Sequence, residues 1–175
     1  MTTGLIFWLT GLSGAGKSTI CSLAAERLRS AGHEAMILDG DEVRAKISPD
    51  LGFSRADILE NNRRIAHYCQ DKRAATHIIL VPLISPLAEG RALARQYLAD
   101  GFFEIYIACD LPTVIARDPK GLYAQAAKGE IKNMIGFAPD SPYDIPDNPD
   151  LVVDTSGNPP DRSAEILSNF VISKL

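Results

Sequence analysis

Residues 11–18 read Gly-Leu-Ser-Gly-Ala-Gly-Lys-Ser, which satisfies the phosphate-binding pattern G-x-x-x-x-G-K-[S/T]. The glycines let backbone N–H groups converge on phosphate oxygens, and Lys17 supplies a mobile cation for the β and γ phosphates. The hydroxyl of Ser18 is suited to bind Mg²⁺. The pattern therefore predicts a P-loop, which binds the phosphates of a nucleotide together with a magnesium ion.

A second group of chemically capable residues is the acidic pair Asp39 and Asp41, which follows the apolar residues 35–38. Carboxylates at the carboxyl end of a parallel strand lie where open α/β sheets bind ligands. One carboxylate near the metal and one near an attacking hydroxyl would suit phosphoryl transfer to an alcohol. The alternative interpretation is a turn with two solvated aspartates. Two other signals of P-loop proteins are absent from the sequence. There is no N-K-x-D sequence, which reads guanine, and the apolar run 78–81 continues into Pro82 rather than a Walker-B aspartate, a place that the acidic pair could take.

Apolar runs alternate with helical patterns, which is typical of βαβ units that form a parallel sheet. The sequence predicts an α/β fold with a mostly parallel five-stranded sheet and helices on both faces. The expected strands cover residues 5–9, 35–38, 77–83, 103–108 and 151–153, and the expected helices cover residues 17–31, 55–75, 87–99, 122–128 and 162–173. The loop of the P-loop pattern then falls between the first strand and the first helix, as the motif requires.

Residues 117–149 lack a sustained strand pattern, and six of the eleven prolines lie between Pro139 and Pro160. Long loops in compact domains are usually functional, and lids over active sites are the common case. We therefore expect a single domain over residues 1–175, with a lid near residues 117–149.

Composition excludes several classes of protein. The chain has a net charge of −4 and a pI of about 5.3, which argue against a binder of nucleic acid polymers. No apolar run approaches the roughly 20 residues that span a membrane. Three scattered cysteines indicate neither a disulfide framework nor a zinc site. Residues 1–4 lack the pattern of a signal peptide, so we expect a cytoplasmic protein.

Taken together, these residues resemble the adenylylsulfate kinase family. The resemblance covers nearly the whole chain. It is carried by the motifs at residues 11–19, 39–44 (Asp-Gly-Asp-Glu-Val-Arg), 50–54 (Asp-Leu-Gly-Phe-Ser), 60–64 (Glu-Asn-Asn-Arg-Arg), 84–86 (Ile-Ser-Pro) and 117–123 (Arg-Asp-Pro-Lys-Gly-Leu-Tyr). The resemblance implies a three-layer P-loop NTPase fold. It also implies an enzyme of sulfate activation that uses ATP and Mg²⁺ to phosphorylate the 3′-hydroxyl of adenosine 5′-phosphosulfate, giving 3′-phosphoadenosine 5′-phosphosulfate.

The resemblance also implies roles for individual residues. The expected catalytic residues are Lys17, Asp41 and Lys120, and the expected metal ligands are Ser18 and Asp39. The ATP-binding residues are Gly11, Ser13, Gly14, Ala15, Gly16, Lys17, Ser18, Thr19 and Arg117. The substrate-binding residues are Asp39, Arg44, Phe53, Asn61, Arg64, Ile84, Ser85, Lys120 and Leu122. Phe53 would stack on the acceptor base, and Lys120 would reach the phosphates from the lid.

Two departures from the family pattern lie in the acceptor region. Ile58 stands where the family usually has an arginine, and Met134 stands in place of an aromatic residue in a loop that is two residues longer. Phe137 could supply a stacking surface from a shifted position. These changes leave open a related kinase that acts on another nucleotide-linked anion, such as a cytidine diphosphate derivative. A nucleotide-sensing regulatory module is a third interpretation, and a homodimer is a possible assembly.

Overall fold

The structure is a computed structural model that describes residues 4–175. Residues 1–3, which belong to the N-terminal stretch judged not to be a signal peptide, lie outside the described residues. The elements are β1 (Leu5–Thr10), α1 (Lys17–Ser30), β2 (Ala35–Ile37), α2 (Gly40–Ile47), α3 (Arg55–Lys72), β3 (Ile78–Pro82), α4 (Ala88–Leu98), β4 (Phe102–Ala108), α5 (Leu111–Arg117), α6 (Leu122–Ala127), β5 (Leu151–Asp154) and α7 (Pro160–Ile172). All ten elements expected from the sequence are present, with boundaries that differ by a few residues.

The five strands form one sheet in the order β2-β3-β1-β4-β5, and every pair is parallel. The α/β prediction is confirmed, and the sheet is wholly rather than mostly parallel. The first strand, β1, lies in the middle. Its residue Phe7 faces Leu80 of β3 on one side and Phe103 of β4 on the other.

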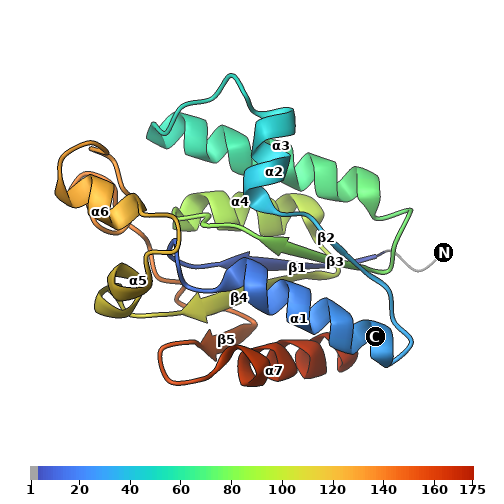
Figure 1. The fold of residues 1–175 in the computed structure, drawn as a ribbon. Coiled ribbons are helices and arrows are strands. Elements are labelled where there is room, and N and C mark those ends of the chain that lie inside the picture. The colour runs from blue at the N-terminus through green and yellow to red at the C-terminus, as the bar shows by residue number, and fades with distance from the viewer. Residues whose placement is uncertain (1–3) are drawn as a thin grey trace.

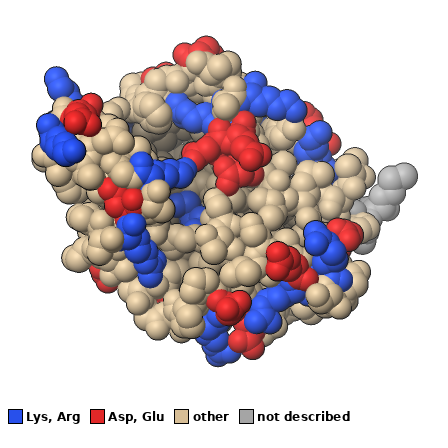
Figure 2. Space-filling model, viewed as in Figure 1, with Lys and Arg blue, Asp and Glu red and all other residues tan. Residues whose placement is uncertain are grey.

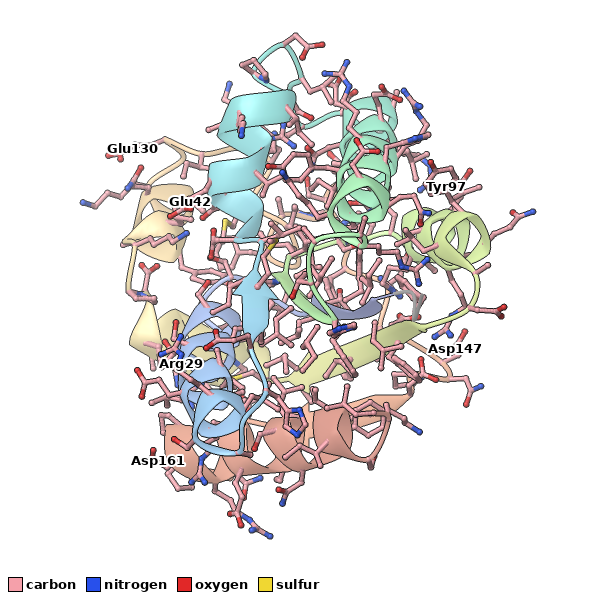
Figure 3. The ribbon with its side chains drawn as sticks, turned by 90° about the vertical axis from the view of Figure 1, so that its right-hand side faces the viewer. Arg29, Glu42, Tyr97, Glu130, Asp147 and Asp161 are labelled. Carbon is pink, nitrogen blue, oxygen red and sulfur yellow. The ribbon has the colours of Figure 1, made fainter. Side chains whose placement is uncertain are left out.

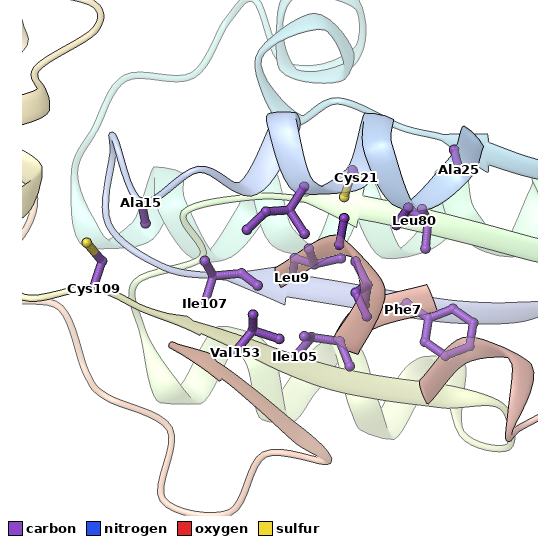
Figure 4. Packing of buried hydrophobic residues seen from close by; sticks show 14 of the residues in the cluster. Phe7, Leu9, Ala15, Cys21, Ala25, Leu80, Ile105, Ile107, Cys109 and Val153 are labelled. Atoms are coloured by element: carbon purple, nitrogen blue, oxygen red, sulfur yellow. The ribbon is translucent and has the colours of Figure 1, made fainter. Parts of the chain in front are cut away.

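Both faces of the sheet are covered, because consecutive side chains of a strand point to opposite sides. Phe7 and Leu9 pack among buried residues of α1 and α7, as Figure 4 shows. Ile6 and Trp8 pack on the other face among buried residues of α3 and α4. The result is three layers, with α1 and α7 on one face and α3 and α4 on the other (Figure 1).

The sequence pattern predicts no helix at α2 or α5, and this prediction is wrong. The carboxylate of Asp39 accepts a hydrogen bond from the backbone N–H of Asp41 at 3.0 Å and caps α2. Asp110 likewise accepts from the N–H of Thr113 at 2.7 Å and caps α5, which has Pro112 in its first turn. Asp caps and Pro in the first turn are ordinary start signals of helices. Both helices were hidden because their start signals follow strands directly.

The expected lid region is partly regular. It begins at the end of α5 and contains α6, and both helices lie beyond the carboxyl ends of the strands (Figure 1). The carboxylate of Asp118 accepts hydrogen bonds from the N–H groups of Tyr123 (3.1 Å) and Ala124 (2.9 Å), so it holds the first turn of α6. After α6 the chain runs through turns and bends to β5.

The outer surface is charged, and the labelled side chains of Arg29, Glu42, Glu130 and Asp161 point outward in Figure 3. Across residues 4–175, none of the helices combines the length and the apolar character needed to cross a membrane.

One charged side chain, Arg73 at the end of α3, is buried far from the loops at the carboxyl ends of the strands. Only 7% of the residue is exposed. Its guanidinium donates to the carbonyl oxygens of Gly4 (2.9 Å), Leu98 (2.9 Å) and Asp100. One side chain therefore joins the start of β1 to α3 and to the turn between α4 and β4.

We predict that Arg73→Met lowers the free energy of unfolding by about 3 kcal/mol, because it leaves buried carbonyl groups without donors. For a chain of this length the melting temperature should fall by roughly 6–12 °C, which thermal unfolding followed by circular dichroism would measure. Arg29→Met is the control. Arg29 pairs with Glu34 at 3.6 Å on the surface, where ion pairs contribute less than about 1 kcal/mol. A melting temperature of Arg73→Met equal to that of the control would contradict the prediction.

Candidate functional site

The P-loop connects β1 to α1, as the sequence predicts. Gly14 and Gly16 have φ angles of +77° and +94°, in the left-handed region that favours glycine. Gly11 lies against the backbone of β4, where an added Cβ would meet a carbonyl oxygen at 2.6 Å. The hydroxyl of Thr155, just after β5, donates to the carbonyl of Ala15 at 2.9 Å. The loop is therefore held open around the amino end of α1 by its own conformation and by its neighbours.

Lys17 is the first residue of α1. Its Nζ donates to the carbonyl oxygens of Gly11 (2.8 Å) and Leu12 (2.7 Å), so the side chain folds over its own loop. Burial lowers the pKa of Lys17 from its ordinary value of 10.5 to about 8, although the nearby carboxylate of Asp41 acts in the opposite direction. The loop therefore holds an ammonium group that is incompletely solvated and able to bind phosphate.

The acidic pair lies beside this loop, at the junction of β2 and α2. The hydroxyl of Ser18 donates to the carboxylate of Asp39 at 2.8 Å. Gly40 separates the two aspartates, and an added Cβ there would lie 2.4 Å from the side chain of Leu83. The absence of a side chain at Gly40 thus lets α2 start directly against the end of β3. The pair is therefore part of a helix start and is fixed close to the P-loop.

The oxygen atoms of Ser18 and Asp39 suit Mg²⁺, which prefers oxygen ligands and usually keeps several waters and substrate phosphates in its shell. Within residues 4–175, His, Cys, Asp and Glu side chains form no group of three able to hold a metal by themselves. Cys21, Cys69 and Cys109 are all buried and free. A magnesium ion here would thus be shared with a bound nucleotide.

The lid reaches this pair through Lys120. Its Nζ forms an ion pair with the carboxylate of Asp41, and both side chains are more than half exposed. Figure 2 shows acidic side chains over α2 meeting basic side chains that extend from the direction of α6, above a hollow in the surface. Lid and acidic pair are thus in contact across the entrance of the site.

A cavity of about 300 Å³ lies beneath this contact. One side is formed by the P-loop and the acidic pair, and the other side is formed by α2, α3, the end of β3 and the lid. The lining residues are Ser13, Gly14, Gly16, Lys17, Ser18, Thr19, Asp39, Gly40, Asp41, Arg44, Phe53, Ile58, Asn61, Asn62, Pro82, Leu83, Ile84, Ser85, Pro86, Pro119, Lys120 and Ile135. The structure therefore brings most of the predicted nucleotide and substrate residues to one cavity.

Three predicted substrate residues form one end of the cavity. The guanidinium of Arg44 lies 4.6 Å from the centre of the Phe53 ring and donates to the carbonyl of Leu51 at 3.0 Å. Phe53 is 60% exposed, which is unusual for a large aromatic side chain. Asn61 is 91% buried, and its Oδ1 has no hydrogen-bond partner. A cation, an exposed ring and an unsatisfied acceptor form a site with the chemistry to bind an anionic nucleotide.

Ser85 lines the cavity but is itself 96% buried. Its Oγ accepts hydrogen bonds from Trp8 Nε1 (3.2 Å) and Asn62 Nδ2 (2.8 Å). The residue has a φ of +42°, a left-handed conformation that is strained for a side chain with a Cβ. Ser85 therefore serves first to fix the turn after β3. Trp8 is a buried core residue, and its ring nitrogen has this additional role.

Other predicted residues lie outside the cavity lining. Gly11 and Ala15 support the P-loop from beneath, Leu122 packs against the core, and Arg117 donates to the carbonyl of Thr155 at 2.6 Å. Arg64 uses its guanidinium to bind Asp50 (2.6 Å) and Glu60 (2.9 Å). These two ion pairs raise the pKa of Arg64 and hold the acceptor side of the site together.

The lid loop that departs from the family pattern does not offer Phe137 as a stacking surface in the cavity. Met134 is buried in the core cluster, and Phe137 packs edge-on against the ring of Tyr123 at 6.0 Å rather than facing the cavity. The lid residue that lines the cavity is Ile135, and Ile58 lines it from α3. Sequence reasoning missed Ile135 and also Asn62, although Asn62 belongs to the quoted motif at residues 60–64.

Comparison with known proteins supports a single family. A family model described as adenylylsulphate kinase matches residues 3–154. The adenylyl-sulfate kinase of Bacillus licheniformis is 45% identical over 95% of this chain and 84% of its own length. The bifunctional enzyme CysN/CysC of Mycobacterium tuberculosis is 46% identical over 98% of this chain and 27% of its own length. The chain thus spans about a quarter of such bifunctional relatives.

Among solved structures, the APS kinase CysC of Mycobacterium tuberculosis in complex with AMPPNP and APS superposes with a TM-score of 0.91. It is 43% identical, and the match covers 98% of this chain and 99% of that one. The match extends over the P-loop, the acidic pair and the lid. On the family match and these relatives, the chain belongs to the adenylylsulfate kinase family.

Proposed function

We propose that the protein transfers the γ-phosphoryl group of ATP to the 3′-hydroxyl of adenosine 5′-phosphosulfate. The observation that carries this proposal is one cavity lined together by P-loop residues, by Asp41 and by the acceptor residues. The 43% identical CysC kinase, whose structure contains AMPPNP and APS, supports the same pair of substrates. The product would be 3′-phosphoadenosine 5′-phosphosulfate, an intermediate of sulfate activation.

The P-loop holds the donor. Its backbone N–H groups and the amino end of α1 cradle the β and γ phosphates of ATP, and Lys17 exchanges its two carbonyl contacts for phosphate oxygens. Ser18 and Asp39 would hold Mg²⁺, which neutralises charge on the transferring phosphoryl group when it is bound. Since catalysis of phosphoryl transfer rests on positioning and charge neutralisation, these contacts supply a large share of it.

Asp41 acts on the attacking hydroxyl. In the structure its carboxylate is paired with Lys120, and both groups are exposed enough to exchange partners. When Lys120 turns to the phosphates of ATP, the carboxylate of Asp41 becomes free to orient the 3′-hydroxyl and accept its proton. The ion pair thus holds the lid near the position that it occupies during the reaction.

The acceptor side binds the second nucleotide. Arg44 carries the positive charge that suits a phosphosulfate anion, and the exposed Phe53 ring offers a surface on which a base can stack. Asn61 presents an unsatisfied carbonyl oxygen to a donor on the nucleotide.

A cytoplasmic location suits three free cysteines. The homodimer stays a prediction, to be checked by the molar mass in solution against the 19.0 kDa of one chain.

The acceptor is tested by following ADP release from MgATP with a panel of nucleotide acceptors. We expect turnover with adenosine 5′-phosphosulfate at a kcat/KM in the ordinary range of about 10⁴–10⁸ M⁻¹s⁻¹. Ile58, which stands where the family usually has an arginine, makes this end of the cavity more apolar than the family pattern, so the panel includes cytidine diphosphate derivatives. Efficient turnover of one of these, with little on adenosine 5′-phosphosulfate, would overturn the proposed acceptor.

We predict that Asp41→Asn lowers kcat at least about 100-fold, because the amide cannot accept the hydroxyl proton. The dissociation constant for ATP should change little, since the amide still fits beside Lys120. Glu42→Gln is the matched control, because it makes the same chemical change at the next residue of α2, where the side chain points outward (Figure 3). Steady-state kinetics and calorimetric titration with ATP provide the two measurements. Near-normal turnover of Asp41→Asn would refute the role of this carboxylate.

ATP binding should depend on pH through Lys17. Because the pKa of Lys17 is about 8, its ammonium is charged below about pH 7 and loses its proton as the pH rises above 8. ATP binds the charged form, so affinity should be constant near neutral pH and fall up to about tenfold for each further pH unit above 8. Calorimetric titrations in two buffers of different ionisation enthalpy should detect proton uptake. Constant affinity up to about pH 10 would contradict the prediction.

A further inference from the structure

A buried hydrogen-bonded cluster adjoins the acceptor side of the cavity without lining it. We call it the Thr10 cluster, and its members are Thr10, Arg91, Glu104 and Tyr143. Thr10 is the last residue of β1, and Tyr143 lies in the chain that returns from the lid. Thr10, Arg91 and Glu104 are each at least 91% buried. A polar group of this size inside the protein is costly unless its members are satisfied, so its contacts are informative.

The direction of the hydrogen bonds at Thr10 can be assigned. Its Oγ1 lies 2.6 Å from the carbonyl oxygen of Ile84 and 2.8 Å from the hydroxyl of Tyr143. A carbonyl only accepts, so the single proton of Thr10 goes to Ile84, and Tyr143 donates to Thr10. Burial raises the pKa of Tyr143 well above its ordinary value, so the phenol keeps the proton that it donates.

Arg91 makes the second set of contacts. Its guanidinium donates to the carbonyls of Ser85 (2.9 Å) and Asp144 (2.7 Å) and to the carboxylate of Glu104 (2.7 Å). Its side chain is 3% exposed. We define the acceptor wall as residues 84–86, all of which line the cavity. Arg91 therefore ties the acceptor wall to the chain returning from the lid.

The returning chain also contacts the wall directly. The N–H of Asp144 donates to the carbonyl of Pro86 at 2.8 Å, and the carboxylate of Asp144 accepts from the N–H of Ala88 at 3.0 Å. Asp144 thus joins the wall at Pro86, and Tyr143 is linked to its other end, Ile84, through Thr10.

The same returning chain positions Ile135. The N–H of Gly136 donates to the carbonyl of Ser141 at 2.7 Å, and the N–H of Ala138 donates to the carbonyl of Met134 at 2.8 Å. These bonds fold residues 134–141 into a compact loop that ends two residues before Tyr143. Ile135 is therefore linked to the acceptor wall through Tyr143 and Asp144, while the core packing of Met134 orients its loop.

We propose that Thr10 and Tyr143 are positioning residues for the acceptor nucleotide, which hold the acceptor wall and Ile135 at the separation that the acceptor requires. This inference rests on the proposed function, because it concerns the acceptor half of the same cavity. Neither side chain lines the cavity, and the hydroxyl of Tyr143 is hydrogen-bonded to Thr10 of β1. Loss of the Tyr143 hydroxyl should therefore weaken acceptor binding and leave ATP binding unchanged.

The first test is Tyr143→Phe, which removes one hydroxyl and keeps the ring. We expect the KM for the acceptor to rise roughly fivefold to tenfold, as for loss of one buried hydrogen bond, while the KM for ATP stays within about twofold. The melting temperature should fall by no more than about 4 °C. Tyr106→Phe is the matched control, because its ring stacks on Tyr143 at 6.3 Å and its hydroxyl lies outside the cluster. It should leave both KM values unchanged.

The second test uses Thr10→Val, which removes the hydroxyl, and Thr10→Ser, which keeps it. Thr10→Val should raise the acceptor KM as Tyr143→Phe does, and Thr10→Ser should restore it to near the wild-type value. The double variant Thr10→Val/Tyr143→Phe should be no worse than the worse single variant, because both remove the same hydrogen bond. An additive double variant, an unchanged acceptor KM in Tyr143→Phe, or an equal rise in both KM values would overturn the proposal.

The proposed function and the positioning role of Thr10 and Tyr143 are tested by different measurements. The wild-type protein tests the proposed function by its turnover with adenosine 5′-phosphosulfate. If another acceptor of the panel proves to be the substrate, the ratio of acceptor KM between Tyr143→Phe and wild type is measured with that acceptor. A ratio well above one supports the positioning role, and a ratio of one contradicts it.

Discussion

The central strand β1 is hydrogen-bonded to β3 on one side and to β4 on the other, and its side chains are buried on both faces. Because its side chains are covered by neighbouring elements, a strand in this position cannot contact a ligand along its length. The polar groups of the site are therefore confined to the carboxyl ends of the strands, where loops replace the sheet. The P-loop after β1, the acidic pair after β2 and the acceptor wall after β3 all follow from this constraint.

The site balances its own charges before any nucleotide binds. Lys17 lies near Asp41, and Asp41 pairs with Lys120 from the lid. This local arrangement is compatible with the two polyanionic nucleotides of the proposed reaction, since a net charge of −4 says nothing about a few cations gathered in one cavity. Phosphates that enter the cavity replace carboxylate and carbonyl partners of the lysines rather than meeting free cations.

Much of the fold was predictable because its signals are local. The buried strands are short apolar runs, and the P-loop lies between the first of them and a helix. Helix α2 was missed because Gly40 weakens the helical pattern. A glycine is required at this position because the side chain of Leu83, which lies far away in sequence, approaches closely. The orientation of the lid loop was equally unpredictable. Met134 enters the core beside Tyr123, and this long-range packing decides that Ile135 rather than Phe137 faces the cavity.

The hydrogen bonds behind the acceptor wall join residues that are remote along the chain. Trp8 and Ser85 are 77 residues apart, and Thr10 and Tyr143 are 133 residues apart. Contacts of such separation carry a large loop-closure entropy, and they form late in folding, after local helices and turns. The P-loop depends on a contact of the same kind, because the hydroxyl of Thr155 donates to the carbonyl of Ala15 across 140 residues. Both halves of the cavity are therefore completed by contacts that close long loops, so we expect the whole cavity to form together in the late steps of folding.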